Sequence, residues 1–281
     1  PFAYSLSFHA ETLIAGSFSK TDRGSRAMYP LTRLYARKLY RQKLIYIFFA
    51  CFFTASFFYA FLISTPQMEE MLNINIGIVG RKNFPEFMMR FYVGTVGILF
   101  NVFLLTLFIC EEDRNKMLYQ PLLHGENRSR MIRSKIYVAV SMSMIFVLLV
   151  AFINYITAFM RWGYEIFEQA AFIRTIIKYL LSGIYMSVIT LGIVTLCICT
   201  RNAWKTIFFV IIYLLIDQFI YSSNIALLQK IWVGYYLNLW TFAYEYQKIP
   251  FSELLIGISI MILYGIAFFQ ISLYRTQKID F

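Results

Sequence analysis

The sequence predicts an all-α integral membrane protein with six transmembrane helices. Of its 281 residues, 59% are apolar and 15% are charged, and the mean hydropathy is +0.62. A soluble domain carries about 45–50% apolar and about 25% charged residues. Six apolar stretches reach the roughly 20 residues that a membrane-spanning helix needs. We predict the spans at residues 44–64, 91–110, 136–160, 174–199, 204–223 and 252–273.

Two segments precede the first span. Residues 1–27 are mixed and polar and lack the pattern of a secretory signal, so we expect a cytoplasmic N-terminal segment before a membrane domain over 28–281. Residues 28–43 predict a basic amphipathic helix, because its apolar and charged residues repeat at helical spacing. Its arginines are Arg33, Arg37 and Arg41. This helix is either an anchor at the membrane surface or a mechanical connector to a cytoplasmic partner.

The basic residues predict the orientation. If the spans alternate and the N-terminus is cytoplasmic, 18 of the 26 Lys and Arg residues lie on the inside. Positive residues are retained on the cytoplasmic side of membranes. We therefore predict a multi-pass protein of the cell membrane with both termini in the cytoplasm. The net charge of +11 then reflects topology and lipid contact rather than nucleic-acid binding, because the basic groups flank spans.

The loop between spans two and three, residues 111–135, is the most informative one. It begins with acidic residues, continues with a short apolar patch and ends with a basic run into span three. Apolar side chains in a charged cytoplasmic loop indicate a docked soluble partner. The candidate coupling residues are Glu111, Glu112, Arg114, Met117, Leu118, Tyr119, Leu122, Leu123, Arg128 and Arg130.

The remaining connections differ in character. Residues 65–90 are expected to form an outer loop, and spans four and five a tight hairpin around Arg201. Residues 224–251 are strongly aromatic and too interrupted to span. They either lie in the membrane interface as an aromatic belt or form a re-entrant hairpin.

The sequence contains no motif of a catalytic or metal site. It has no Gly-Lys pair for a phosphate-binding loop, two histidines without zinc-ligand spacing, and four cysteines in or beside apolar runs. The charged exception within a span is Asp217, which Arg174 and Lys178 are placed to pair with. Asp217, Asn101 and Asn154 are the candidate pathway or gate residues, although packing roles explain them as well.

Topology and loop character together resemble the membrane subunits of exporter-type ATP-binding-cassette transporters, the type V class that includes ABCG-like half-transporters and bacterial permeases. The resemblance rests on the helix at 28–43, the Leu118–Leu123 stretch within the loop, the aromatic segment before span six and the basic tail from Tyr274. The N-terminal segment 1–27 is longer than the resemblance leads us to expect.

The resemblance implies a permease subunit without its own nucleotide site. A separate ATPase subunit would bind the 111–130 loop and the connecting helix, supplying ATP and Mg²⁺, and a second permease chain, identical or not, would complete the pathway. The cargo would be amphipathic or hydrophobic (a peptide, toxin, drug or lipid-like molecule), with export or antimicrobial immunity as the role. The alternative is an ion-coupled secondary transporter or channel.

Overall fold

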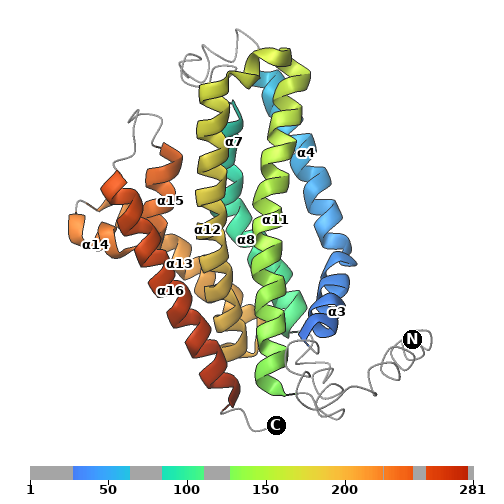
Figure 1. Ribbon diagram of the computed structural model, residues 1–281, viewed down its shortest axis with the longest axis vertical. Coiled ribbons are helices and arrows are strands. Elements are labelled where there is room, and N and C mark those ends of the chain that lie inside the picture. The colour runs from blue at the N-terminus through green and yellow to red at the C-terminus, as the bar shows by residue number, and fades with distance from the viewer. Residues whose placement is uncertain (1–27, 64–83, 111–126, 224, 243–250, 278–281) are drawn as a thin grey trace.

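The computed structural model describes residues 28–63, 84–110, 127–223, 225–242 and 251–277, and these residues form helices without a strand (Figure 1). Six of the helices are long and apolar enough to cross a membrane: Lys43–Leu62, Phe84–Cys110, Ser129–Trp162, Ala171–Thr200, Ala203–Ile220 and Ser252–Thr276. The predicted six-span, all-α architecture is confirmed.

The predicted connecting helix is present as α3 (Met28–Tyr40). It stops one turn before α4 (Lys43–Ile63), the first span. The backbone N–H groups of Arg41 and Gln42 still donate to Arg37 and Leu39, so the chain turns without leaving these N–H groups unsatisfied. α3 is therefore a separate helix whose direction differs from that of the first span (Figure 1).

Span two is longer than expected and is interrupted. It consists of α7 (Phe84–Phe91), the π-helical η2 (Tyr92–Val96), α8 (Gly97–Leu105) and the π-helical η3 (Thr106–Cys110). Residues 84–90, predicted as part of an outer loop, are helical instead. Gly94 departs from helical dihedrals, which marks a kink. A Cβ atom at Gly97 would lie 2.3 Å from the Tyr92 carbonyl oxygen, so this close approach requires glycine.

Spans three and four form the centre of the bundle. α11 (Arg128–Trp162) and α12 (Gln169–Thr200) run antiparallel and are joined by η4 (Gly163–Phe167). Small residues let them approach closely: a Cβ atom at Gly183 of α12 would lie 2.5 Å from the Met144 sulfur, and the hydroxyls of Ser143 and Ser187 are 3.4 Å apart. In an 18-residue apolar stretch of α12, 72% of the residues are buried inside the bundle.

Spans four and five form the predicted tight hairpin. Arg201 adopts the left-handed conformation (φ 50°), and the Asn202 side chain accepts a hydrogen bond from the Lys205 N–H at the start of α13 (Ala203–Ser222). The hydroxyls of Thr200 and Thr206, 2.8 Å apart, link the two helices across the turn.

The aromatic segment forms two short helices, α14 (Ala226–Ile231) and α15 (Val233–Phe242), before the last span α16 (Phe251–Gln277). α15 packs against α12 and buries Val233, Tyr236 and Leu237, whereas Leu227 and Ile231 of α14 are exposed. The described part of the aromatic segment is thus mostly helical, and α15 is partly integrated into the bundle.

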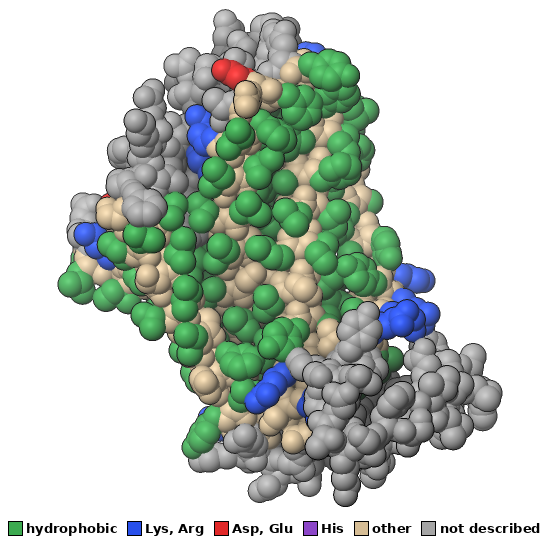
Figure 2. Space-filling model, in the orientation of Figure 1, with side chains coloured by type: hydrophobic (Ala, Val, Ile, Leu, Met, Phe, Trp, Pro, Cys, Tyr) green, Lys and Arg blue, Asp and Glu red, His purple; other side chains and the backbone are tan. Residues whose placement is uncertain are grey.

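The surface follows from this arrangement. In the corresponding 18-residue stretches of α13 and α16, only 17% and 11% of the residues are buried. Apolar side chains cover the visible face between the two ends of the bundle (Figure 2). Such a surface matches hydrocarbon rather than water. α3, the start of α11 and the end of α16 lie at one end of the bundle, hereafter the α3 end, and η4 lies at the other (Figure 1).

Candidate functional site

At the α3 end, the connecting helix is anchored to both helices that flank the 111–126 segment. Tyr35 and Leu39 of α3 are buried. The Tyr35 ring meets Phe108 of η3 edge-on, with centroids 6.0 Å apart. The ammonium group of Lys135 in α11 lies 5.4 Å from the same ring centroid, a cation–π contact. One aromatic side chain thus ties α3 to the end of span two and to the start of span three.

Apart from Lys135, the basic residues described at this end are exposed or half-buried. Arg33 and Arg37 are exposed on α3, and Arg41 is exposed directly after its last residue. The first residue of α11 is Arg128, and Arg130 is half-buried in its first turn. The Asn127 side chain accepts from the Ser129 N–H and caps this helix. The other predicted coupling residues, from Glu111 to Leu123, lie outside the described residues.

Asn154, a predicted pathway residue, lies in a buried hydrogen-bond network that crosses four helices. Its amide nitrogen donates to the Tyr179 hydroxyl at 2.9 Å, and its amide oxygen accepts from Ser56 at 3.0 Å. The Tyr179 hydroxyl donates in turn to the Pro85 carbonyl oxygen at 2.7 Å. The network joins α4, α11, α12 and α7. It satisfies polar groups whose transfer from water to an apolar medium without a hydrogen bond would cost about 4–8 kcal/mol each.

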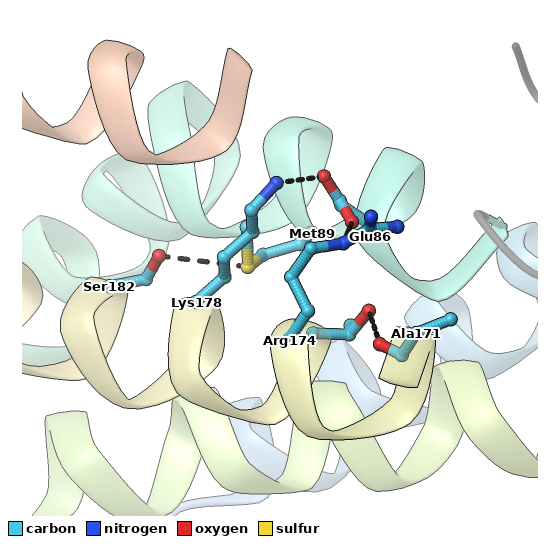
Figure 3. Close-up of polar contacts among 7 residues, drawn as sticks. Glu86, Met89, Ala171, Arg174, Lys178 and Ser182 are labelled. Atoms are coloured by element: carbon cyan, nitrogen blue, oxygen red, sulfur yellow. Dashed lines mark hydrogen bonds and ion pairs between the residues drawn. The ribbon is translucent and has the colours of Figure 1, made fainter. Parts of the chain in front are cut away.

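Beside this network lies a buried ion-pair cluster that the sequence does not predict. Glu86 of α7 is 1% exposed and accepts a hydrogen bond from the Lys178 ammonium of α12. The Arg174 guanidinium lies 3.6 Å from the other carboxylate oxygen, with its side chain 45% exposed. Figure 3 shows both cations reaching from successive turns of α12 toward Glu86. The predicted pairing of Arg174 and Lys178 with Asp217 is therefore wrong.

Asp217 has different partners. Its Oδ1 accepts a hydrogen bond from the Trp232 indole at 2.6 Å, and a Cβ atom at Gly234 would lie 1.6 Å from the same oxygen. The carboxylate therefore sits against the first turn of α15, where the helix dipole favours a negative charge. The Trp232 ring stacks on Tyr213 at 5.3 Å, and the Tyr213 hydroxyl lies 3.2 Å from that of Tyr185. The cluster fastens α15 to α13 and α12.

Asn101 lies in a third environment. It is 4% exposed, and its amide nitrogen has no hydrogen-bond partner among the described residues. It borders a cavity of about 30 Å³ whose lining is otherwise almost entirely apolar. The three residues predicted as a pathway thus contact three separate sets of neighbours and do not form one site.

Several residues of these clusters were not predicted. Glu86 was assigned to a loop, and Tyr179, Ser56 and Trp232 were not singled out. The spacing of Arg174 and Lys178, four residues apart on one apolar helix, carried a signal, because two cations on one face of a span require a buried anion. Nothing in the local sequence identifies Glu86 as that anion.

Comparison with known proteins agrees with this architecture. The family model described as ABC-2 family transporter protein matches residues 36–217. No curated protein and no solved structure matched the chain. The matched region begins at Ala36 within α3, runs through most of α13 and includes the 111–126 segment. With six spans and a match over well over half its length, this chain belongs to the ABC-2 family of transporter proteins and is a transmembrane subunit of an ATP-binding-cassette transporter.

Proposed function

We propose that this chain is the permease of an exporter whose ATPase subunit docks at the α3 end, on the 111–126 segment and the exposed arginines of α3. The observation that carries the proposal is the position of Tyr35, whose ring contacts both Phe108 and Lys135. A displacement imposed on the loop between spans two and three is therefore also imposed on α3. The family implies the ATP-binding partner, which would supply ATP and Mg²⁺.

The cargo that we propose is amphipathic or hydrophobic, moved outward between two permease chains. The support is the character of the spans, in which apolar side chains dominate both the interior and the surface. Glu86 and Asp217 are each engaged with partners that fix helices to one another. This engagement favours ATP-driven transport over the ion-coupled alternative, which would need carboxylates that exchange ions. Export of a peptide or toxin, with a role in immunity, is the narrower form of the proposal.

The experiment is co-purification of the ATPase from native membranes in mild detergent. Arg33→Glu with Arg37→Glu, and separately Leu122→Asp with Leu123→Asp, should reduce ATPase recovery about tenfold or more, because charge reversal and buried charge at an interface cost at least about 1.4 kcal/mol. Lys205→Glu is the matched control, since Lys205 is an exposed cation at the α12–α13 turn and is not part of the proposed docking surface. Recovery that is equal in all four proteins would refute the docking surface.

A further inference from the structure

The side chain of Trp204 lies outside the packed bundle. It is 80% exposed at the start of α13, and its indole N–H has no hydrogen-bond partner among the described residues. Trp162 and Trp232, in contrast, contact Phe84 and Asp217. A tryptophan combines a large apolar surface with one N–H donor, and this combination is enriched where a membrane meets water.

The turn that carries Trp204 is held in place by local contacts. The Asn202 side chain accepts a hydrogen bond from the Lys205 N–H. The hydroxyls of Thr200 and Thr206 lie 2.8 Å apart across the turn, and Thr206 is fully buried. The first turn of α13 is therefore fixed to the end of α12, and Trp204 projects from a defined position.

Trp204 begins a stripe of exposed apolar side chains on α13. The members of the stripe recur every three or four residues and so share one face of the helix. They are Trp204, Phe208, Ile211, Leu215 and Phe219. The 20 residues of α13 extend about 30 Å at 1.5 Å per residue, which is the thickness of the hydrocarbon core of a bilayer. Arg201 and Asn202, just before the helix, are polar and exposed. Trp204 thus lies at the boundary between an apolar surface and a polar turn.

The surroundings of Trp204 are basic. Lys205 is exposed beside it, and Arg275 is exposed near the end of α16. The hydroxyls of Thr195 and Ser272, 2.9 Å apart, set α12 and α16 in register. Counted from this contact and from the one across the α12–α13 turn, Arg275 and Trp204 differ in height by about 6 Å. The described residues of α3, of the turn and of the last two turns of α16 include no Asp or Glu. Figure 2 shows Lys and Arg side chains at this edge of the apolar surface. Such a basic rim fits anionic headgroups.

We propose that the α12–α13 turn anchors the protein to lipid headgroups of the leaflet at the α3 end. The Trp204 indole N–H donates to carbonyl or phosphate oxygens of the lipids, and Lys205 and Arg275 pair with anionic headgroups. Each cation close to an anionic surface strengthens binding about fivefold. Because Thr206 fixes the first turn of α13 to α12, the anchor holds the central helix α12 at a constant depth in the bilayer.

The test uses the full chain in lipid vesicles and the fluorescence of Trp204. The chain has four tryptophans, so the signal is the difference between the wild type and Trp204→Phe. The vesicles contain phosphatidylcholine that carries bromine, a quencher, either near the headgroup end or near the methyl end of its acyl chain. We expect bromine near the headgroup end to quench Trp204 more strongly, because the indole lies at the membrane interface.

The preference for anionic lipid is measured with brominated phosphatidylglycerol and brominated phosphatidylcholine at equal mole fractions. Phosphatidylglycerol should be enriched around Trp204, and Lys205→Gln with Arg275→Gln should reduce this enrichment at least about fivefold. Lys230→Gln is the matched control, because Lys230 is an exposed cation of α14, which follows the opposite end of α13. This variant should keep the enrichment of the wild type.

Stronger quenching by bromine near the methyl end would place Trp204 in the hydrocarbon and overturn the anchor. Quenching by neither lipid would overturn it as well, because water or a protein surface, such as a second copy of this chain, would then cover the side chain. Equal quenching by the two headgroup types in the wild type would overturn the anionic preference. If the double variant keeps the full enrichment, Lys205 and Arg275 do not bind the headgroups.

Discussion

Removing Glu86 should destabilise the protein more than removing either of its cations, and the order of the costs follows from burial. Glu86→Gln removes the carboxylate that accepts from the Lys178 ammonium, whose side chain is 3% exposed. Breaking a buried ion pair from one side costs about 3–5 kcal/mol, because the remaining charge cannot be hydrated. The glutamine oxygen still accepts from Lys178, so we expect the lower end, about 3 kcal/mol.

The cations should be less costly to remove. Lys178→Met leaves the Glu86 carboxylate beside Arg174 at 3.6 Å, so the lost hydrogen bond to a charged group costs about 1.5–3 kcal/mol. Arg174→Gln should cost below about 1 kcal/mol, because its side chain is 45% exposed and its pairing is screened by solvent. In the double variant Glu86→Gln with Lys178→Met neither buried charge remains, and its total cost should fall below the sum of the single costs by about 1–3 kcal/mol.

The assay is the free energy of unfolding from titration with a denaturing detergent in mixed micelles, with helix content followed by circular dichroism. The wild type, three single variants and the double variant are compared at one temperature and one protein concentration. Strict additivity of Glu86→Gln and Lys178→Met would refute the direct pair. A cost for Arg174→Gln as large as that for Glu86→Gln would refute the assignment of Lys178 as the principal partner.

Two further predictions use the same titration. Gly97→Ala should lower the free energy of unfolding by about 1–3 kcal/mol, because its Cβ atom would lie 2.3 Å from the Tyr92 carbonyl oxygen. Gly265→Ala is the control and should be neutral or slightly stabilising, because the nearest atom to its Cβ is 3.8 Å away. Equal effects of the two substitutions would contradict the close approach at Gly97. Asp217→Ala should cost about 1–3 kcal/mol, because the Trp232 indole loses its acceptor. Asp217→Asn should cost less, about 0.3–1 kcal/mol, since only the charge at the start of α15 is lost, and it should leave co-purification of the ATPase unchanged. If Asp217→Asn is as costly as Asp217→Ala, the charge rather than the indole bond holds α15.

The number of spans and the connecting helix could be predicted because both are recorded in local sequence. A span shows itself as a run of apolar residues whatever its neighbours are, and α3 shows itself through the four-residue spacing of Arg33, Arg37 and Arg41. The first residues of α11 and α12, Arg128 and Gln169, could not be predicted in this way, because both helices extend beyond their apolar stretches into polar sequence. A helix continues past the hydrocarbon wherever its backbone hydrogen bonds are satisfied.

The polar contacts could not be predicted, because each joins residues from different helices. Glu86 lies in a charged stretch that resembles a loop, and its burial depends on Lys178, which is 92 residues further along the chain. The expected pairing of Asp217 with Arg174 and Lys178 rests only on their similar depth in the membrane. Asp217 instead accepts a hydrogen bond from Trp232, which lies in a segment whose structure the sequence does not determine. Hydropathy predicts depth in the membrane, and it carries no information about which helix faces which.

Span two connects the two regions on which the proposed mechanism depends. Its N-terminal part, α7, is fixed to α12 by Glu86 and by the Pro85 carbonyl oxygen. Its C-terminal part ends at η3, where Phe108 meets the connecting helix. Between them lies η2, in which the backbone of Gly94 departs from helical dihedrals. π-helical segments of this kind occur frequently at functional sites. Because both ends are held by tertiary contacts, we expect a displacement applied at η3 to bend the span at η2 before it separates the buried ion pair.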